Sequence, residues 1–198
     1  MVEPIGYDRA QAARLAAGAD RVLEEMKVER TLDDALGDCV DVIMTSGRGG
    51  PEALTPRETA QRLLAAPGPV ALVFGDEVRG LTNAQLARAA AVATIPTTEK
   101  SSINLAQSVL IFAYELMLAQ HDAPPVPQQE APLAGERILS KLRERAQSLL
   151  LDAGFLNPQQ PEAILDELLK LLRRTSPTRR EAELLLAAVD QLKRRVRQ

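Results

Sequence analysis

The sequence has few of the residues that build metal sites, disulfides and membrane spans. Its 198 residues include one cysteine, one histidine and no tryptophan, and aromatic residues make up 3%. Cys39 has no second cysteine to pair with, and Cys39 with His121 is too small a set for a zinc site. No apolar run reaches the roughly 20 residues of a membrane span, and MVEPIGYDRA lacks the features of a signal peptide. We therefore expect a cytoplasmic protein with an aliphatic core, no metal and no membrane partner.

The net charge is small, but its distribution is uneven. The total is −3, which by itself argues against a general nucleic-acid binder. Residues 1–133 hold 11 Lys and Arg against 18 Asp and Glu, a balance of −7, whereas residues 134–198 hold 13 against 9, a balance of +4. The basic residues of the second segment are either a solvated face or a set of phosphate contacts that the acidic first segment lacks.

The first part of the chain alternates between predicted strands and helices. Short apolar segments predict three buried strands, CVDVIMTS (39–46), GPVALVFG (68–75) and AVATIP (91–96). Helical patterns precede and separate them, with a start at Thr55 or Pro56 in TPRETAQRLLAA, and a long helix follows from Ser102. Continuous apolar strands alternating with helices are typical of an α/β fold with a parallel sheet covered on both faces.

A proline-rich segment, HDAPPVPQQEAPLAG, interrupts this pattern. We expect a core at residues 1–120, a linker at 121–133 and a small helical appendage at 134–198. The appendage contains three amphipathic segments, GERILSKLRERAQSLLLDAGF, PEAILDELLKLLRR and SPTRREAELLLAAVDQLKRRV. The last one predicts a helix with Ser176 as N-cap and Pro177 in its first turn.

The segment SSINLAQSVLIFAYELML (101–118) begins with polar residues and then becomes apolar. In the simpler interpretation Ser101 or Ser102 caps a buried helix. In the other, these polar groups and the helix N-terminus face a ligand or a loop. The surrounding motifs decide between the two.

Three loops follow the predicted strands: TSGRGG, GDEVRGL and IPTTEKSSIN. Ligands of parallel sheets bind beyond the carboxyl ends of the strands, so these loops share one candidate crevice. None is a phosphate loop or a dinucleotide fingerprint, and no GxSxG is present. Asp76, Glu77 and Arg79 form either a solvated turn or, in a crevice, a set in which Glu77 holds an arginine and Arg79 meets a phosphate.

Two of these loops carry a specific resemblance. LVFGDEVRGLTNAQL followed by ATIPTTEKSSINLAQSVLIFAYEL resembles the second and third motifs of the SpoU-type RNA ribose 2′-O-methyltransferases of the trefoil-knotted SPOUT superfamily. TSGR and the tail LLDAGFLNPQQPEAILDELLKLLRRTSPTRREAELL are similar to the TrmJ-like branch, which modifies the tRNA anticodon loop at position 32. The resemblance covers almost the whole chain.

The resemblance implies a C-terminal knot, S-adenosylmethionine as cofactor, tRNA as substrate and a homodimer formed through the knot region. It implies that Glu77, Ser102 and Asn104 support catalysis. The implied cofactor contacts, matched by position, are Thr45, Ser46, Gly47, Gly75, Ile95, Ser102, Ile103 and Asn104. The expected RNA contacts are Arg79, Arg173, Arg174, Arg179 and Arg180.

The beginning of the chain departs from the family pattern. Family members open with a strand and a helix that carries an asparagine and an arginine, and MVEP resembles the end of the next strand. We therefore expect an N-terminally truncated domain without the arginine that activates the ribose hydroxyl. Two alternatives stay open: a non-catalytic relative that binds cofactor or RNA, and a helical scaffold on an α/β body whose polar loops are ordinary turns.

Overall fold

A parallel sheet of three short strands forms the centre of the structure, a computed structural model that describes residues 1–98, 103–122 and 132–196. The strands are β1 (Asp41–Thr45), β2 (Val70–Val73) and β3 (Ala91–Ala93), and β1 lies between the other two in the order β2-β1-β3. Both pairings are parallel, with Ile43 opposite Leu72 and Ala91. This confirms the predicted parallel sheet, although each strand is shorter than the apolar segment that predicted it.

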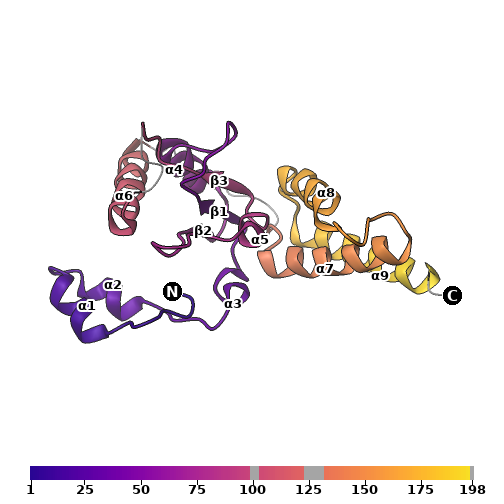
Figure 1. The fold of residues 1–198 in the computed structure, drawn as a ribbon, viewed down its shortest axis with the longest axis horizontal. Helices are drawn as coiled ribbons and strands as arrows, with labels where there is room; N and C mark the ends of the chain where they lie inside the picture. The colour runs from indigo at the N-terminus through magenta and orange to yellow at the C-terminus, as the bar shows by residue number, and fades with distance from the viewer. Residues whose placement is uncertain (99–102, 123–131, 197–198) are drawn as a thin grey trace.

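Helices cover both faces of the sheet (Figure 1). Side chains of a strand alternate between the two faces, so Ile43 packs with Leu63 and Phe112, while Met44 packs with Leu36 on the other side. The first face is covered by α4 (Pro56–Ala65) and α6 (Leu105–Asp122), and the second by α3 (Leu32–Leu36) and α5 (Asn83–Leu86). The buried β1 residues therefore form the core of a three-layer body.

Local sequence explains where two of these helices begin. Thr55 accepts a hydrogen bond from Glu58 N, while the Glu58 carboxylate accepts one from Thr55 N, which forms a capping box with Pro56 in the first turn. The Thr55 hydrogen bonds lower the pKa of Glu58. Thr82 and Gln85 form the same arrangement in front of α5. The predicted helix start at Thr55 or Pro56 is confirmed.

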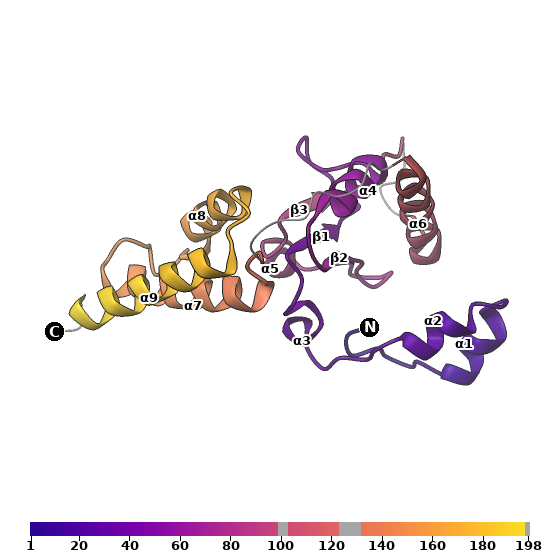
Figure 2. The same cartoon turned by 180° about the vertical axis from the view of Figure 1, so that it is seen from behind.

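The first thirty residues lie beside the body and contribute nothing to its buried core. They form α1 (Arg9–Leu15) and α2 (Asp20–Glu25), which lie apart from the sheet in Figures 1 and 2 and hold no buried residue. An isolated parallel bridge joins Val2 to Glu29, just before α3. Several apolar side chains of this segment are exposed, among them Ile5, Leu15, Val22 and Val28.

Three helices form the tail: α7 (Glu136–Asp152), α8 (Glu162–Arg174) and α9 (Arg179–Val196). Ala134, Leu139 and Ala182 are the centre of a small core of their own. The start of α7 is bonded to the body, since Glu136 N donates to Cys39 O at 2.9 Å and Arg137 N donates to Gly37 O at 3.1 Å. The predicted helical appendage is thus present and is attached to the body by backbone hydrogen bonds.

The start of α9 corrects a prediction. Thr178, and not Ser176, is the N-cap, because Thr178 Oγ1 accepts from Glu181 N and the Glu181 carboxylate accepts from Thr178 N. The Glu181 carboxylate accepts from Thr178 N and also from Thr178 Oγ1, and these two bonds lower the pKa of Glu181. Pro177 is buried before the helix instead of lying in its first turn. A serine followed by proline resembled a cap, but the capping box two residues later determines where the helix begins.

Two further expectations concern the topology and the membrane. The predicted trefoil knot depends on the path of the chain before α6, where residues 99–102 lie outside the described residues, so the knot stays a prediction. Among the described helices, none combines the length and the apolar character needed to span a bilayer.

Candidate active site

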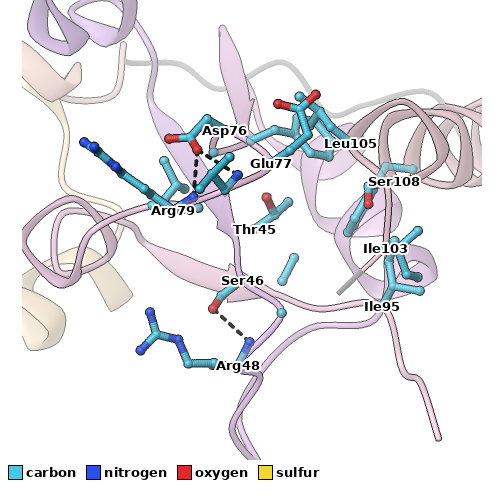
Figure 3. A pocket seen from close by; sticks show the side chains of 18 residues that line it. Thr45, Ser46, Arg48, Asp76, Glu77, Arg79, Ile95, Ile103, Leu105 and Ser108 are labelled. Atoms are coloured by element: carbon cyan, nitrogen blue, oxygen red, sulfur yellow. Dashed lines mark hydrogen bonds between the residues drawn. The ribbon is translucent and has the colours of Figure 1, made fainter. Parts of the chain in front are cut away.

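A pocket of about 320 Å³ lies beyond the carboxyl ends of all three strands. The three loops that the sequence predicted to converge do meet here (Figure 3). Figure 3 shows Thr45 between the loop of Asp76, Glu77 and Arg79 on one side and Ile103 and Ser108 on the other. The predicted site residues that line this pocket are Thr45, Ser46, Gly47, Gly75, Glu77, Arg79, Ile95 and Ile103.

The first loop is fixed by hydrogen bonds to the ends of the neighbouring strands. Thr45 Oγ1 donates to Val73 O at 3.0 Å, and Ser46 N donates to Ala93 O at 2.9 Å. Ser46 Oγ accepts from Arg48 N at 3.1 Å, which leaves its hydroxyl proton available to a ligand. The loop therefore offers a hydroxyl donor at a position set by all three strands.

The second loop, Gly75–Leu81, is a tight turn closed by Asp76. Asp76 Oδ1 accepts from Arg79 N at 2.7 Å and Val78 N at 2.9 Å, and Gly80 N donates to Asp76 O. These two backbone bonds, led by that from Arg79, lower the pKa of Asp76. Asp76 is thus an ionised carboxylate that holds the turn together. Of the two interpretations of Asp76, Glu77 and Arg79, the turn is the one that applies to Asp76.

Glycine is required at two positions of this turn. A Cβ atom at Gly75 would lie 2.3 Å from the carbonyl carbon of Gly80, so no side chain fits there. Gly80 has φ +66°, in the left-handed region that glycine adopts without strain. With Gly75 in place, the backbone of the loop approaches the pocket directly. Glu77 and Arg79 are exposed at the rim and extend in different directions in Figure 3.

The third part of the pocket is the beginning of α6, where another prediction is corrected. Helix α6 begins at Leu105, and Asn104 Oδ1 accepts from Ala106 N at 2.9 Å and Gln107 N at 3.4 Å. Asn104 is therefore the cap, in place of Ser101 or Ser102. Its side chain does not line the pocket, whereas those of Ile103, Leu105 and Ser108 do. Ser102 lies outside the described residues.

Sequence reasoning missed the apolar floor of the pocket. Phe74 and Phe112 both line it, and their rings meet edge to face with centroids 5.7 Å apart at 74°. Leu105, Ser108 and Phe112 follow one another at helical spacing on one face of α6. That spacing was readable, and it would have assigned these residues to the pocket once the start of α6 was known. The other lining residues missed are Arg48, Val78, Leu81 and Ala93.

The predicted RNA-contacting arginines of the tail differ in their exposure and in their ion pairs with carboxylates. Arg173 donates from both terminal nitrogens to Glu136 at 2.7 and 2.8 Å, and the two side chains are 13% and 4% exposed. Arg173 and Glu136 therefore form a buried ion pair within the tail, and Arg173 is not exposed as a surface phosphate contact would be. Arg179 is exposed and pairs with Glu183 one turn later, while Arg174 and Arg180 are exposed.

No group of three or more metal-ligating side chains occurs within residues 1–98, 103–122 and 132–196. The single thiol, Cys39, is half-buried, and burial followed by the charges of Asp38 and Glu136 raises its pKa. A raised pKa keeps a thiol protonated and a poor nucleophile. Cys39 also does not line the pocket, so we assign it no role there.

Comparison with known proteins agrees with these features. A family model described as the SpoU rRNA methylase family matches residues 2–114. A protein of Klebsiella pneumoniae named tRNA (cytidine/uridine-2'-O-)-methyltransferase TrmJ is 35% identical over 96% of this chain and 84% of its own length. A Yersinia pestis protein of the same name is 36% identical over 93% of this chain and 76% of its own length.

Solved structures show the same similarity. The crystal structure of TrmJ from Z. mobilis ZM4 aligns with a TM-score of 0.76 and 30% identity, over 95% of this chain and 83% of the other. A probable methylase family protein from Haemophilus influenzae aligns with a TM-score of 0.57 and 29% identity, over 98% and 83% of the two chains. The similarity thus includes both the α/β body and the helical tail.

Proposed function

The chain belongs to the SpoU rRNA methylase family, a family of RNA methyltransferases, and on that premise we propose that it methylates a ribose 2′-hydroxyl in the anticodon loop of tRNA. The observation that carries the proposal is one pocket that three strand-end loops build together. It occurs in a chain that aligns over 96% of its length with a relative named as a tRNA 2'-O-methyltransferase. A tRNA substrate is also consistent with a cytoplasmic location.

S-adenosylmethionine is the methyl donor in this proposal, and the pocket fits its mixed character. A volume of about 320 Å³ is within the range of small-molecule sites. Phe74 and Phe112 provide an apolar floor, Gly75 allows close approach to the backbone, and Ser46 offers a hydroxyl donor. When bound, the cofactor supplies an electrophilic methyl group.

The remaining roles follow from the chemistry of a methyl displacement. Such a step needs alignment of the ribose hydroxyl with the methyl group and removal of one proton. Glu77, a carboxylate at the rim, orients a cationic group there. Asn104 acts as a positioning residue, because its cap fixes the helix end that carries Ile103, Leu105 and Ser108. Ser102 keeps its proposed supporting role from the family motif.

Binding of tRNA requires cations, and the acidic body has fewer of them than it has carboxylates. Arg79 at the rim and the exposed Arg174, Arg179 and Arg180 of the tail are the proposed phosphate contacts. Arg173 is removed from this set, because breaking its buried pair would leave Glu136 uncompensated.

We further propose that α6 forms a homodimer interface. Its side away from the sheet presents an apolar stripe at helical spacing whose members, Val109, Leu110, Tyr114 and Met117, are 42% to 67% exposed. An apolar stripe on the helix that bounds the pocket is suited to a second copy of the chain.

The test is methyl transfer from labelled S-adenosylmethionine to tRNA, followed by detection of 2′-O-methylcytidine or 2′-O-methyluridine. We expect the wild-type chain to transfer methyl groups. We expect Glu77→Gln to have at least a tenfold lower kcat, since misalignment of the ribose hydroxyl with the methyl group is costly. Glu52→Gln is the matched control, because Glu52 is exposed in the loop after β1 but does not line the pocket. Equal rates for the two variants would contradict the role of Glu77. Cofactor binding without any transfer would favour the non-catalytic relative.

A further inference from the structure

A second cavity, of about 520 Å³, lies at the opposite end of the sheet. Its body side is formed by Val40 and Asp41 at the start of β1, by Ala66 and Pro67 before β2, and by Ala90 before β3. Its tail side is formed by residues before and in α7, at the end of α8 and between α8 and α9: Leu133, Ala134, Leu139, Arg173, Arg174, Ser176 and Pro177. This seam cavity therefore lies where the body meets the tail.

Three arginines line the seam cavity, and two of them are held in place by carboxylates. Arg62 donates to both oxygens of Asp41 at 2.8 and 3.1 Å, and Arg173 donates to both oxygens of Glu136. Each of these pairs uses two of the five N–H donors of a guanidinium. The third arginine, Arg174, is exposed at the end of α8. Three guanidinium groups thus line the cavity, and two carboxylates pair with them. Each paired guanidinium group keeps N–H donors that its carboxylate does not use.

A strained residue faces the same cavity. Ser176 has φ +46°, in the left-handed region that glycine usually occupies after a helix. The turn around it is fixed, since Ala134 N donates to Pro177 O and Arg179 N donates to Pro132 O, both at 2.8 Å. Strained residues held by the surrounding structure are concentrated at binding sites. Here the strained turn places a serine, where glycine is usual, at the edge of a cavity that contains arginines.

We propose that the seam cavity binds a phosphate group of the RNA backbone, with Arg62 of the body and Arg174 of the tail donating to the same phosphate. The choice of RNA rests on the proposed function, whereas the phosphate chemistry rests on the cavity itself. Arginine forks match phosphate oxygens, and positioning by carboxylates reduces the entropy lost on binding. Val40, Pro67 and Leu133 add apolar wall on which a sugar can pack.

The test measures RNA affinity as a function of salt concentration for wild type and Arg174→Gln. Losing one phosphate contact lowers affinity about tenfold and reduces the slope of log K against log salt by about 0.7–0.9. The matched control is Arg21→Gln, which removes the same charge from an arginine of α2 that is 85% exposed and remote from the seam. A second variant, Arg62→Gln with Asp41→Asn, keeps an uncharged pair and tests the body side.

If both sides hold one phosphate, the loss caused by Arg174→Gln is smaller in the Arg62→Gln, Asp41→Asn background than in wild type. A second experiment raises inorganic phosphate at constant ionic strength and records thermal unfolding. Stabilisation that Arg174→Gln removes would show that free phosphate also binds, while no stabilisation together with lower RNA affinity assigns the site to RNA alone. Arg174→Gln matching Arg21→Gln in both experiments would overturn the proposal.

Failure of the seam site is distinguishable from failure of the proposed function. If the wild-type chain transfers methyl groups and Arg174→Gln binds RNA with unchanged affinity, the seam site and the RNA contact of Arg174 are overturned, but the proposed methyl transfer is not. If Arg174→Gln binds RNA more weakly than wild type but the wild-type chain transfers no methyl group, only the enzymatic proposal is overturned.

Discussion

The two ends of the sheet are built in different ways. At the carboxyl end, loops that each follow a strand supply glycines, hydroxyls and backbone groups, and neighbouring strands fix them through bonds such as Thr45 to Val73. At the amino end, the cavity is formed by two parts of the chain distant in sequence and contains paired arginines. The first end suits a small ligand that contacts the backbone, and the second suits an anion. The difference fits the two proposals, a cofactor site at the carboxyl end and a phosphate site at the amino end.

The largest expected effect is at the amino end, on the pair that supports the seam. Glu136→Gln leaves Arg173 buried without a counter-charge, which destabilises the tail by about 3–5 kcal/mol. Urea denaturation followed by circular dichroism measures the change. Glu144→Gln, an exposed position on the same helix, should change stability by less than about 0.5 kcal/mol. Similar values for the two variants would show that the pair is not a structural element of the tail.

The next effect is at the carboxyl end. Gly75→Ala places a Cβ atom 2.3 Å from Gly80, so the turn must shift, at a cost of about 1–3 kcal/mol. Gly50→Ala is the matched control, because a Cβ atom there meets nothing within 4 Å and φ is not in the left-handed region. Thermal unfolding of both variants separates crowding from the substitution itself. Equal unfolding temperatures would contradict the close approach of Gly75 and Gly80.

A smaller effect concerns the cap of α6. Asn104→Ala removes the acceptor for Ala106 N and Gln107 N and should cost about 0.5–2 kcal/mol. Gln107→Ala, an exposed position in the first turn, serves as control. Hydrogen exchange at the first turn of α6 measures the loss locally. Unchanged protection in Asn104→Ala would return the capping role to the preceding serines.

The smallest effect is the pH dependence of the turn that Asp76 closes. Its pKa is lowered from the ordinary value of 3.8, so the stabilisation is complete above about pH 3.8 and is lost as pH falls through the lowered pKa of the folded state. Asp76→Asn keeps an acceptor without a charge and should remove this dependence. Unfolding curves between about pH 2 and 5 test it, and identical pH profiles would show that Asp76 does not contribute.

The carboxyl end was largely predictable from the sequence, and the amino end was not. Parallel strands end at one edge, so the loops with Ser46, Gly75 and Ile95 had to converge. The pairing of Glu136 with Arg173 joins residues 37 positions apart on different helices, and no local pattern predicts it. Local competition explains the other errors, because the side-chain oxygens of Asn104 and Thr178 accept from free N–H groups of the first helical turn and so provide the caps.

Titration calorimetry with S-adenosylmethionine tests the separation of the two ends most directly. We predict saturable binding to wild type, at least tenfold weaker binding to Gly75→Ala, and wild-type affinity for Gly50→Ala and Arg174→Gln. This result follows if the cofactor contacts only the loops at the carboxyl end. Wild-type affinity in Gly75→Ala, or weakened binding in Arg174→Gln, would contradict the assignment of the cofactor to the carboxyl end and of the seam phosphate to the amino end of the sheet.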